Sequence, residues 1–142
     1  MIRHFSLSDL DRILEIESLA FPKSPYDTPT FIRLHCQYPN TFWVYVGPTS
    51  VRKGNEIWGY IVFSTEGHII SIAVHLERRR TGIGKELIQR MLEQPRIKKI
   101  MAEVRKNNRG AQTFYRSLGF QTVGVIPNYY GDEDALVMEK RR

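Results

Sequence analysis

The chain has 142 residues, of which 42% are hydrophobic and 25% are charged, and its formal net charge is +6. This length fits one domain, and the composition excludes a disordered chain, a collagen-like chain and a coiled coil. The apolar runs are too short to span a bilayer, and the first residues lack the apolar region of a secretory signal. We therefore expect one domain over residues 1–142 and a cytoplasmic location.

The pattern of apolar residues predicts mixed α/β structure. The predicted elements are, in order, a strand at 2–5, helices at 10–20 and 28–37, strands at 42–47, 57–65 and 68–74, a helix from 82 to about 94, a strand at 97–104, a helix at 110–118, and strands at 120–126 and 135–139. Residues 48–55 are predicted to form a turn. The strand-helix-strand step across residues 68–104 implies a parallel pair with a right-handed crossover.

Three short patterns predict how helices begin and end. Ser6 and Ser8 are each followed three residues later by an aspartate, Asp9 and Asp11, a pattern that resembles a capping box. Thr28 followed by Pro29 predicts an N-cap with proline at the first helical position. Gly119 is the predicted end of the last helix.

The single cysteine, Cys36, cannot form an internal disulfide, which removes the main argument for an oxidised, secreted protein. It lies in a predicted amphipathic helix, where a lone cysteine usually fills the core. We expect no covalent catalytic role for it.

The positive charge is concentrated in short clusters. These clusters are residues 78–80, residues 96, 98 and 99, residues 105, 106 and 109, and residues 140–142. An excess of positive charge favours polyanionic partners, so a nucleic acid and a phosphorylated cofactor both fit the pattern. A solvated surface is the plain alternative for most of these residues.

The segment from Arg79 to Lys85 lies between an apolar strand and an amphipathic helix. Its two glycines, Gly82 and Gly84, let the backbone turn tightly and approach a ligand closely. The unpaired N–H groups at the start of the helix suit a phosphate. The spacing matches neither a Walker A loop nor a dinucleotide-binding fingerprint. A glycine-rich connection with incidental arginines is the alternative.

Together with other segments, this loop resembles the GNAT family of N-acetyltransferases. In that family the loop has the pattern Gln/Arg-x-x-Gly-x-Gly/Ala, which Arg79 to Gly84 match. The other matching segments are Ser71–Val74, Glu103–Arg105 with Asn107 and Asn108, Phe114–Phe120, and Asn128–Tyr130 with Glu133–Ala135. In this order they resemble the branch that acetylates protein N-termini, the RimI-like ribosomal-protein acetyltransferases and their archaeal relatives. The resemblance covers nearly the whole chain.

The resemblance implies a GNAT fold of the α/β class. It implies a mixed, mostly antiparallel sheet of six to seven strands, flanked by about four helices, with a splay between strands four and five. It also implies acetyl-CoA as the acetyl donor and no metal. The implied acetyl-CoA-binding residues are Ile72, Ala73, Val74, Arg79, Arg80, Thr81, Gly82, Ile83, Gly84, Lys85, Asn108 and Tyr115.

The resemblance further implies three residues for the chemistry. Glu103 is the implied general base, directly or through water, and the alternative is a surface carboxylate paired with Arg105. His68 matches a histidine implicated in catalysis in archaeal relatives, and imidazole is a suitable base near neutral pH. Tyr115 is the implied hydrogen-bond or proton donor to the leaving thiolate, and packing against Phe120 is its alternative.

The implied peptide-binding residues are Phe21, Pro22 and Tyr26 in one loop and Tyr129 and Tyr130 in another. We expect direct attack by the N-terminal α-amine of a protein in a ternary complex, with ribosomal proteins among the candidate substrates. The alternatives are a lysine side chain, a polyamine or another small amine as acceptor, an inactive fold that serves as a partner subunit and, from a different class, a basic nucleic-acid-binding module. We expect a monomer or a weak homodimer, no membrane partner and no nucleic-acid partner.

Overall fold

The computed structural model describes residues 1–49 and 54–142, which form two compact units. The first unit consists of Met1–Ser64 and Ile70–Arg90, and the second of Thr65–Ile69 and Met91–Arg142. The predicted single acetyltransferase domain stays a prediction. Within the described ranges, no helix has the length and apolar character that a membrane crossing needs.

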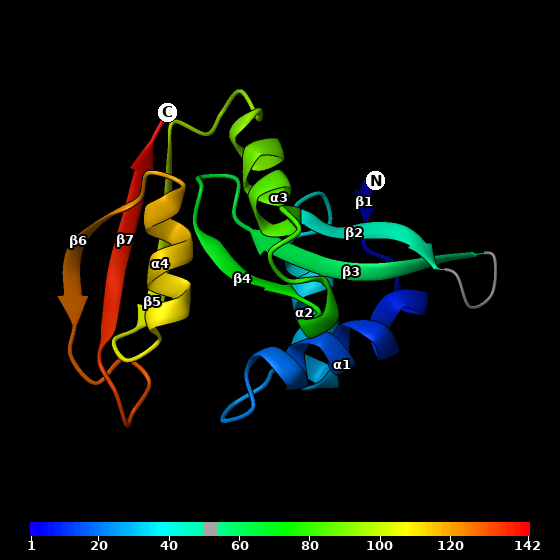
Figure 1. Cartoon of the computed structure of the whole chain (residues 1–142), viewed down its shortest axis with the longest axis horizontal. Coiled ribbons are helices and arrows are strands. Elements are labelled where there is room, and N and C mark those ends of the chain that lie inside the picture. The colour runs from blue at the N-terminus through cyan, green and yellow to red at the C-terminus, as the bar shows by residue number, and fades with distance from the viewer. Residues whose placement is uncertain (50–53) are drawn as a thin grey trace. The chain divides into compact units, whose positions relative to one another are not determined.

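The first unit contains a four-stranded sheet with the order β1-β2-β3-β4 (Figure 1). Its elements are β1 (Ile2–His4), α1 (Leu10–Ala20), α2 (Thr28–Gln37), β2 (Phe42–Thr49), β3 (Gly54–Phe63), β4 (Ile69–Val74) and most of α3 (Ile83–Leu92). The β1–β2 and β2–β3 pairs are antiparallel. The order of this sheet makes β4 an edge strand within it.

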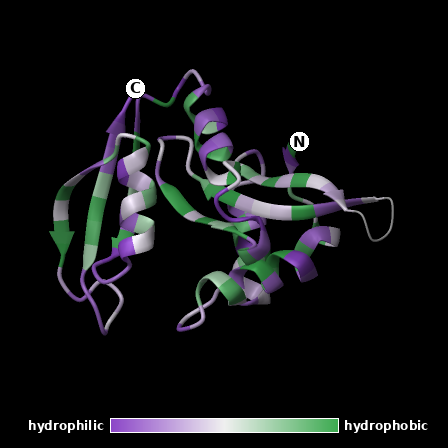
Figure 2. Ribbon diagram, in the orientation of Figure 1, coloured by the Kyte–Doolittle hydropathy of each residue, from purple (hydrophilic) through white to green (hydrophobic). Residues whose placement is uncertain are grey.

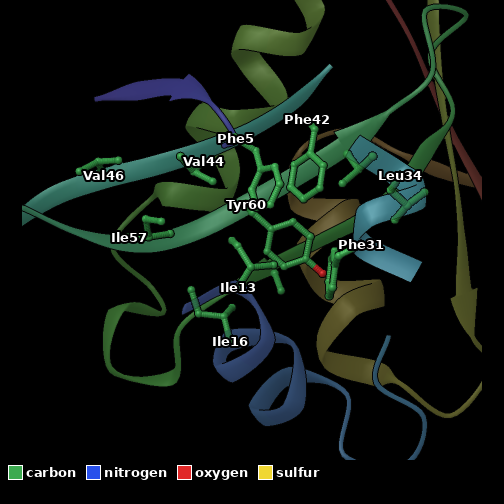
Figure 3. Close-up of a cluster of buried hydrophobic side chains, with 12 residues drawn as sticks. Phe5, Ile13, Ile16, Phe31, Leu34, Phe42, Val44, Val46, Ile57 and Tyr60 are labelled. Atoms are coloured by element: carbon green, nitrogen blue, oxygen red, sulfur yellow. The ribbon is translucent and has the colours of Figure 1, made fainter. Parts of the chain in front are cut away.

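The core of the first unit forms where α1 and α2 pack on the sheet. Alternate residues of β2 and residues at helical spacing on α1 and α2 supply it, as their sequence periodicity predicts. Figure 3 shows the Tyr60 ring between Phe31 and Phe42, with the α1 side chains beneath it. The buried members of this cluster are Phe5, Ile13, Ile16, Phe31, Leu34, Phe42, Val44, Val46, Ile57, Tyr60, Val62 and Ala73.

The second unit contains a three-stranded antiparallel sheet with the order β5-β7-β6. Its elements are β5 (Lys99–Arg105), α4 (Arg109–Ser117), β6 (Gln121–Ile126) and β7 (Ala135–Arg141). Alternate residues of β5, namely Ile100, Ala102 and Val104, are buried. In Figure 2 α4 carries both hydrophobic and hydrophilic residues, as expected for a helix with one face on a sheet.

The predicted order of elements and the mixed α/β class are confirmed. The seven described strands form two sheets rather than the single sheet that was expected. The expected parallel pair between strands four and five is reduced to an isolated parallel bridge between His68 and Met101. His68 therefore precedes β4 instead of opening it.

Two local predictions were wrong. Pro48 pairs with Asn55 across β2 and β3, so both residues belong to strands, and residues 50–53 of the predicted turn lie outside the described part of the chain. The N-cap of α2 is Asp27 and not Thr28, because the Asp27 carboxylate accepts a hydrogen bond from the Thr30 N–H at 3.0 Å. The end of α4 agrees with the prediction, since Gly119 follows the C-cap with φ 95°.

Candidate active site

The loop between β4 and α3 has a backbone that few residues adopt. Arg80 and Gly82 have positive φ angles of 65° and 86°. A Cβ atom at Gly82 would meet no heavy atom within 4 Å, so the backbone angle, and not space, is what favours glycine there. Arg80 is a non-glycine residue in the left-handed region, a conformation that concentrates at ligand-binding segments.

This loop fits a phosphate group. The first helical hydrogen bond of α3 runs from the Glu86 N–H to the Gly82 carbonyl at 2.9 Å. The N–H groups of Ile83 and Gly84 precede that bond and therefore have no intrahelical acceptor. Arg79, Arg80, Thr81 and Lys85 are exposed beside them. Backbone donors, the helix dipole and exposed cations together make a site for an anion.

The other predicted acetyl-CoA contacts have mixed surroundings. On β4, Ile72 and Val74 are half-buried and Ala73 lies in the core. The Asn108 side chain caps α4, because its oxygen accepts a hydrogen bond from the Ala111 N–H at 3.0 Å. A contact between Asn108 and the pantetheine arm stays a prediction.

His68 and Glu103 form a hydrogen-bonded pair in the second unit, with 2.7 Å between His68 Nε2 and Glu103 Oε2. Gly67, with φ 103°, lets the chain approach β5 closely, since a Cβ there would lie 2.0 Å from the Lys99 carbonyl oxygen. The hydrogen bond to Glu103 raises the pKa of His68, against the opposing effect of burial. Arg105, which was weighed as the partner of Glu103, pairs with Asp132 and Glu133.

Tyr115 is buried and packs against Phe120, with ring centroids 5.0 Å apart. Burial raises the pKa of the Tyr115 phenol well above its usual value, and Tyr130 and Glu103 add to this effect. Tyr115 therefore has the packing contact that was weighed as its alternative role, and its role as a donor to the thiolate stays a prediction. This phenol keeps its proton at any physiological pH.

The two tyrosines of the β6–β7 loop, Tyr129 and Tyr130, belong to the surroundings of Glu103 and Tyr115. Tyr129 is 48% exposed and packs edge-on against Tyr130 at 4.9 Å between centroids. Burial and the charge of Glu103 raise the pKa of Tyr129. The second unit thus brings together His68, Glu103, Tyr115, Tyr129 and Tyr130.

The predicted peptide-binding residues of the α1–α2 loop lie in the first unit. Phe21 and Tyr26 are half-buried and pack against the core, whereas Pro22 is exposed. The Tyr26 N–H donates to the Glu17 carboxylate at 2.9 Å. A role of these three residues in peptide binding stays a prediction.

Sequence reasoning missed Glu17. Its side chain is 2% exposed, and its carboxylate accepts hydrogen bonds from the Tyr26 N–H and the Tyr60 hydroxyl. Burial raises the pKa of Glu17. The available signal was its spacing on α1, because it lies four residues after Ile13 and thus on the apolar face.

Cys36 is exposed on α2, so the expectation that it fills the core was wrong. It lies two residues after the buried Leu34, which turns it toward the opposite face of the helix. Across residues 1–49 and 54–142, no group of three or more His, Cys, Asp or Glu side chains could hold a metal ion.

Comparison with known proteins identifies the family of this chain. Residues 10–120 match the family described as the acetyltransferase (GNAT) family. An uncharacterised N-acetyltransferase of Methanocaldococcus jannaschii is 37% identical over 150 residues, which cover 100% of this chain and 92% of the relative. An N-alpha-acetyltransferase of Sulfurisphaera tokodaii is 34% identical, with 96% of this chain and 90% of the relative covered.

A solved structure shares the fold. The crystal structure of Ard1 from Thermoplasma volcanium superposes with a TM-score of 0.81 at 29% identity, covering 99% of this chain and 96% of that chain. The family match spans the β4–α3 loop, Ser71–Val74, Glu103–Arg105 and Phe114–Phe120, which are among the segments from which the resemblance was inferred. The chain therefore belongs to the GNAT family of acetyltransferases.

Proposed function

We propose that this enzyme transfers the acetyl group of acetyl-CoA to the N-terminal α-amino group of proteins by direct attack in a ternary complex. The observation that carries the proposal is the His68–Glu103 pair, with 2.7 Å between His68 Nε2 and Glu103 Oε2. The name of the Sulfurisphaera relative, an N-alpha-acetyltransferase, supports the same acceptor.

The reaction needs a neutral amine. An α-amino group has a pKa of about 7.7–8.0, whereas a lysine side chain has one of about 10.4. His68, with its pKa raised by Glu103, is a base suited to the less basic amine. As the nitrogen bonds to the acetyl carbon, its proton passes to the imidazole, and the Glu103 carboxylate stabilises the resulting imidazolium.

Tyr115 acts on CoA, the second product of the reaction. The carbon–sulfur bond breaks and leaves a thiolate, whose conjugate thiol has a pKa of about 8.5. Because burial raises the pKa of Tyr115, the phenol is a weaker acid than that thiol. We therefore assign Tyr115 the role of a hydrogen-bond donor that stabilises the thiolate, and not of a full proton donor.

Most of the acetyl-CoA contacts in this proposal come from the first unit. The diphosphate of acetyl-CoA binds the N–H groups at the start of α3 and the exposed cations from Arg79 to Lys85. The pantetheine arm adds to the edge strand β4 through the backbone of Ile72 and Val74. A backbone N–H near Val74 polarises the acetyl oxygen.

A panel of acceptors tests the proposal. CoA release is measured with acetyl-CoA and short peptides whose first residue is Ser, Ala, Thr, Met or Glu, one of them copying a ribosomal protein N-terminus. N-terminally blocked peptides with an internal lysine, and spermidine, complete the panel. Turnover confined to free α-amines supports the proposal, and turnover with blocked lysine peptides or spermidine contradicts it.

We expect a cytoplasmic reaction and a monomer or weak homodimer.

A further inference from the structure

The loop between β6 and β7, residues 127–134, is fastened to the end of β5 by Arg105. The Arg105 Nη1 atom donates to the Asp132 carboxylate at 3.0 Å and to the Glu133 carboxylate at 3.2 Å. The guanidinium carbon also lies 4.2 Å from the centroid of the Tyr130 ring. One side chain therefore contacts three residues of the loop.

Other contacts hold the two ends of the same loop. The second Glu133 oxygen accepts a hydrogen bond from the Asn107 N–H at 2.7 Å, and the Asp134 carbonyl accepts one from the Lys106 N–H at 3.1 Å. The Asp134 carboxylate accepts one from the Asn128 N–H at 2.9 Å. These bonds fix where the loop begins and ends, whereas Arg105 is the side chain that reaches its aromatic pair.

The contact of Arg105 with Glu133 is sheltered from water, whereas Asp132 is 61% exposed. The Arg105 side chain is 20% exposed and that of Glu133 is 10% exposed, so this pair is screened far less than a surface pair. The planar guanidinium can bind carboxylates through its edge while its face covers an aromatic ring, whereas the ammonium of lysine is a compact point charge without this geometry. Arg105 thus fixes the orientation of the Tyr130 ring.

Strand β5 carries both Glu103, the partner of the base His68, and Arg105, which holds the β6–β7 loop. Successive side chains of a strand point to opposite faces, so Glu103 and Arg105 lie on the same face of β5. Glu103 contacts His68, and Arg105 contacts Tyr130, against which the exposed Tyr129 packs. The same strand therefore positions the base and the tyrosine pair.

We propose that Arg105 is a positioning residue that holds Tyr130, and through it Tyr129, in the orientation that receives the acceptor peptide. The inference rests on the proposed function, in which these tyrosines contact the peptide. It assigns to Arg105 an effect on acceptor binding and none on the proton transfer between the amine and His68.

Steady-state kinetics of Arg105→Ala and Arg105→Lys test this role. We expect both variants to raise KM for the peptide at least tenfold and to change KM for acetyl-CoA less than twofold. The acid limb of the pH–rate profile, which reports His68, should not move. The control is Arg116→Ala, because Arg116 is an exposed arginine on the neighbouring α4. Equal effects on the two KM values, or no effect on the peptide KM, would overturn the proposal.

A double-mutant comparison separates positioning from a general structural effect. Once Tyr130→Ala has removed the ring, adding Arg105→Ala should raise the peptide KM little further. If the two substitutions raise the peptide KM by factors that multiply fully in the double variant, Arg105 does not act through Tyr130 and the proposal is contradicted.

Hydrogen exchange provides a readout that needs no peptide. In Arg105→Ala the amides of residues 128–134 should exchange faster, while those of β5 and β7 keep their protection. If exchange is unchanged in this loop, the inference is wrong even where the enzyme acetylates α-amines. If the wild-type enzyme acetylates no α-amine, the proposed function is wrong, and the exchange result still shows whether Arg105 holds the loop.

Discussion

Tyr60→Phe removes one hydroxyl from a buried polar network in the first unit. The Tyr60 side chain is completely buried, and its hydroxyl donates to the Glu17 carboxylate and lies 2.8 Å from Ser71 Oγ. The substitution keeps the ring in the core. It leaves one Glu17 oxygen and the Ser71 hydroxyl without this partner.

The size of the effect follows from these contacts. A hydrogen bond to a charged group contributes about 1.5–3 kcal/mol, and a buried acceptor that loses its donor adds to the loss. We therefore expect the free energy of unfolding to fall by about 2–3 kcal/mol at pH 8. With an unfolding entropy of about 2.1 cal/mol/K per residue and 142 residues, this corresponds to a decrease in Tm of about 7–10 °C.

The effect should depend on pH. Because burial raises the pKa of Glu17, the folded protein binds this proton more tightly than the unfolded chain does. The stability contributed by this group is therefore present at low pH and is lost as the pH rises through the folded-state pKa. Tyr60→Phe removes a donor to the ionised form, which raises this pKa further, so its cost should shrink between pH 8 and pH 5.

Urea unfolding of four proteins checks the reasoning, namely the wild type, Tyr60→Phe, Glu17→Gln and the double variant. Glu17→Gln provides the matched background, since a neutral amide replaces the carboxylate. In that background Tyr60→Phe should cost only about 0.5–1.5 kcal/mol, the value of a neutral hydrogen bond. A pH-independent loss below about 1 kcal/mol in the wild-type background would refute the argument.

Three further predictions concern the proposed site. Glu103→Gln weakens the hydrogen bond and removes the charge that raise the pKa of His68, so the acid limb of kcat/KM should move to lower pH while the plateau falls. An unmoved limb would exclude His68 as the group that titrates. Gly82→Ala introduces a Cβ at φ 86°, which costs about 1–2 kcal/mol of backbone strain. We therefore expect this variant to raise KM for acetyl-CoA by about tenfold. The control Gly124→Ala on β6 should leave that KM unchanged. Tyr115→Phe should lower kcat by about ten- to a hundredfold, as expected for one lost transition-state hydrogen bond, with thermal stability retained because the ring is kept; an unchanged kcat would remove Tyr115 from the mechanism.

The order of elements was predictable because apolar periodicity decides it locally. Ile13 and Ile16 on α1 and the alternation along β5 both follow from spacing alone. Turn residues were less predictable, since Asp27 and Thr28 are both good N-caps and only the geometry of the first helical turn selects between them.

The pairings within the site could not be predicted from sequence. His68 and Glu103 are 35 residues apart, and the parallel bridge that brings them together is a tertiary contact. Arg105 was weighed as a partner of Glu103, and the structure shows it in contact with Asp132 and Glu133 of the β6–β7 loop. The resemblance supplied the site residues but not the partners that orient them.

The most direct test of the central claim uses a matched pair of peptides of one sequence with an internal lysine, one with a free N-terminus and one N-terminally blocked. Each is incubated with acetyl-CoA and the enzyme, and mass spectrometry locates the added acetyl group. The account predicts acetylation of the α-amine of the free peptide and none of the blocked one. Acetylation of the internal lysine in the blocked peptide, at a rate equal to that of the free peptide, would contradict it.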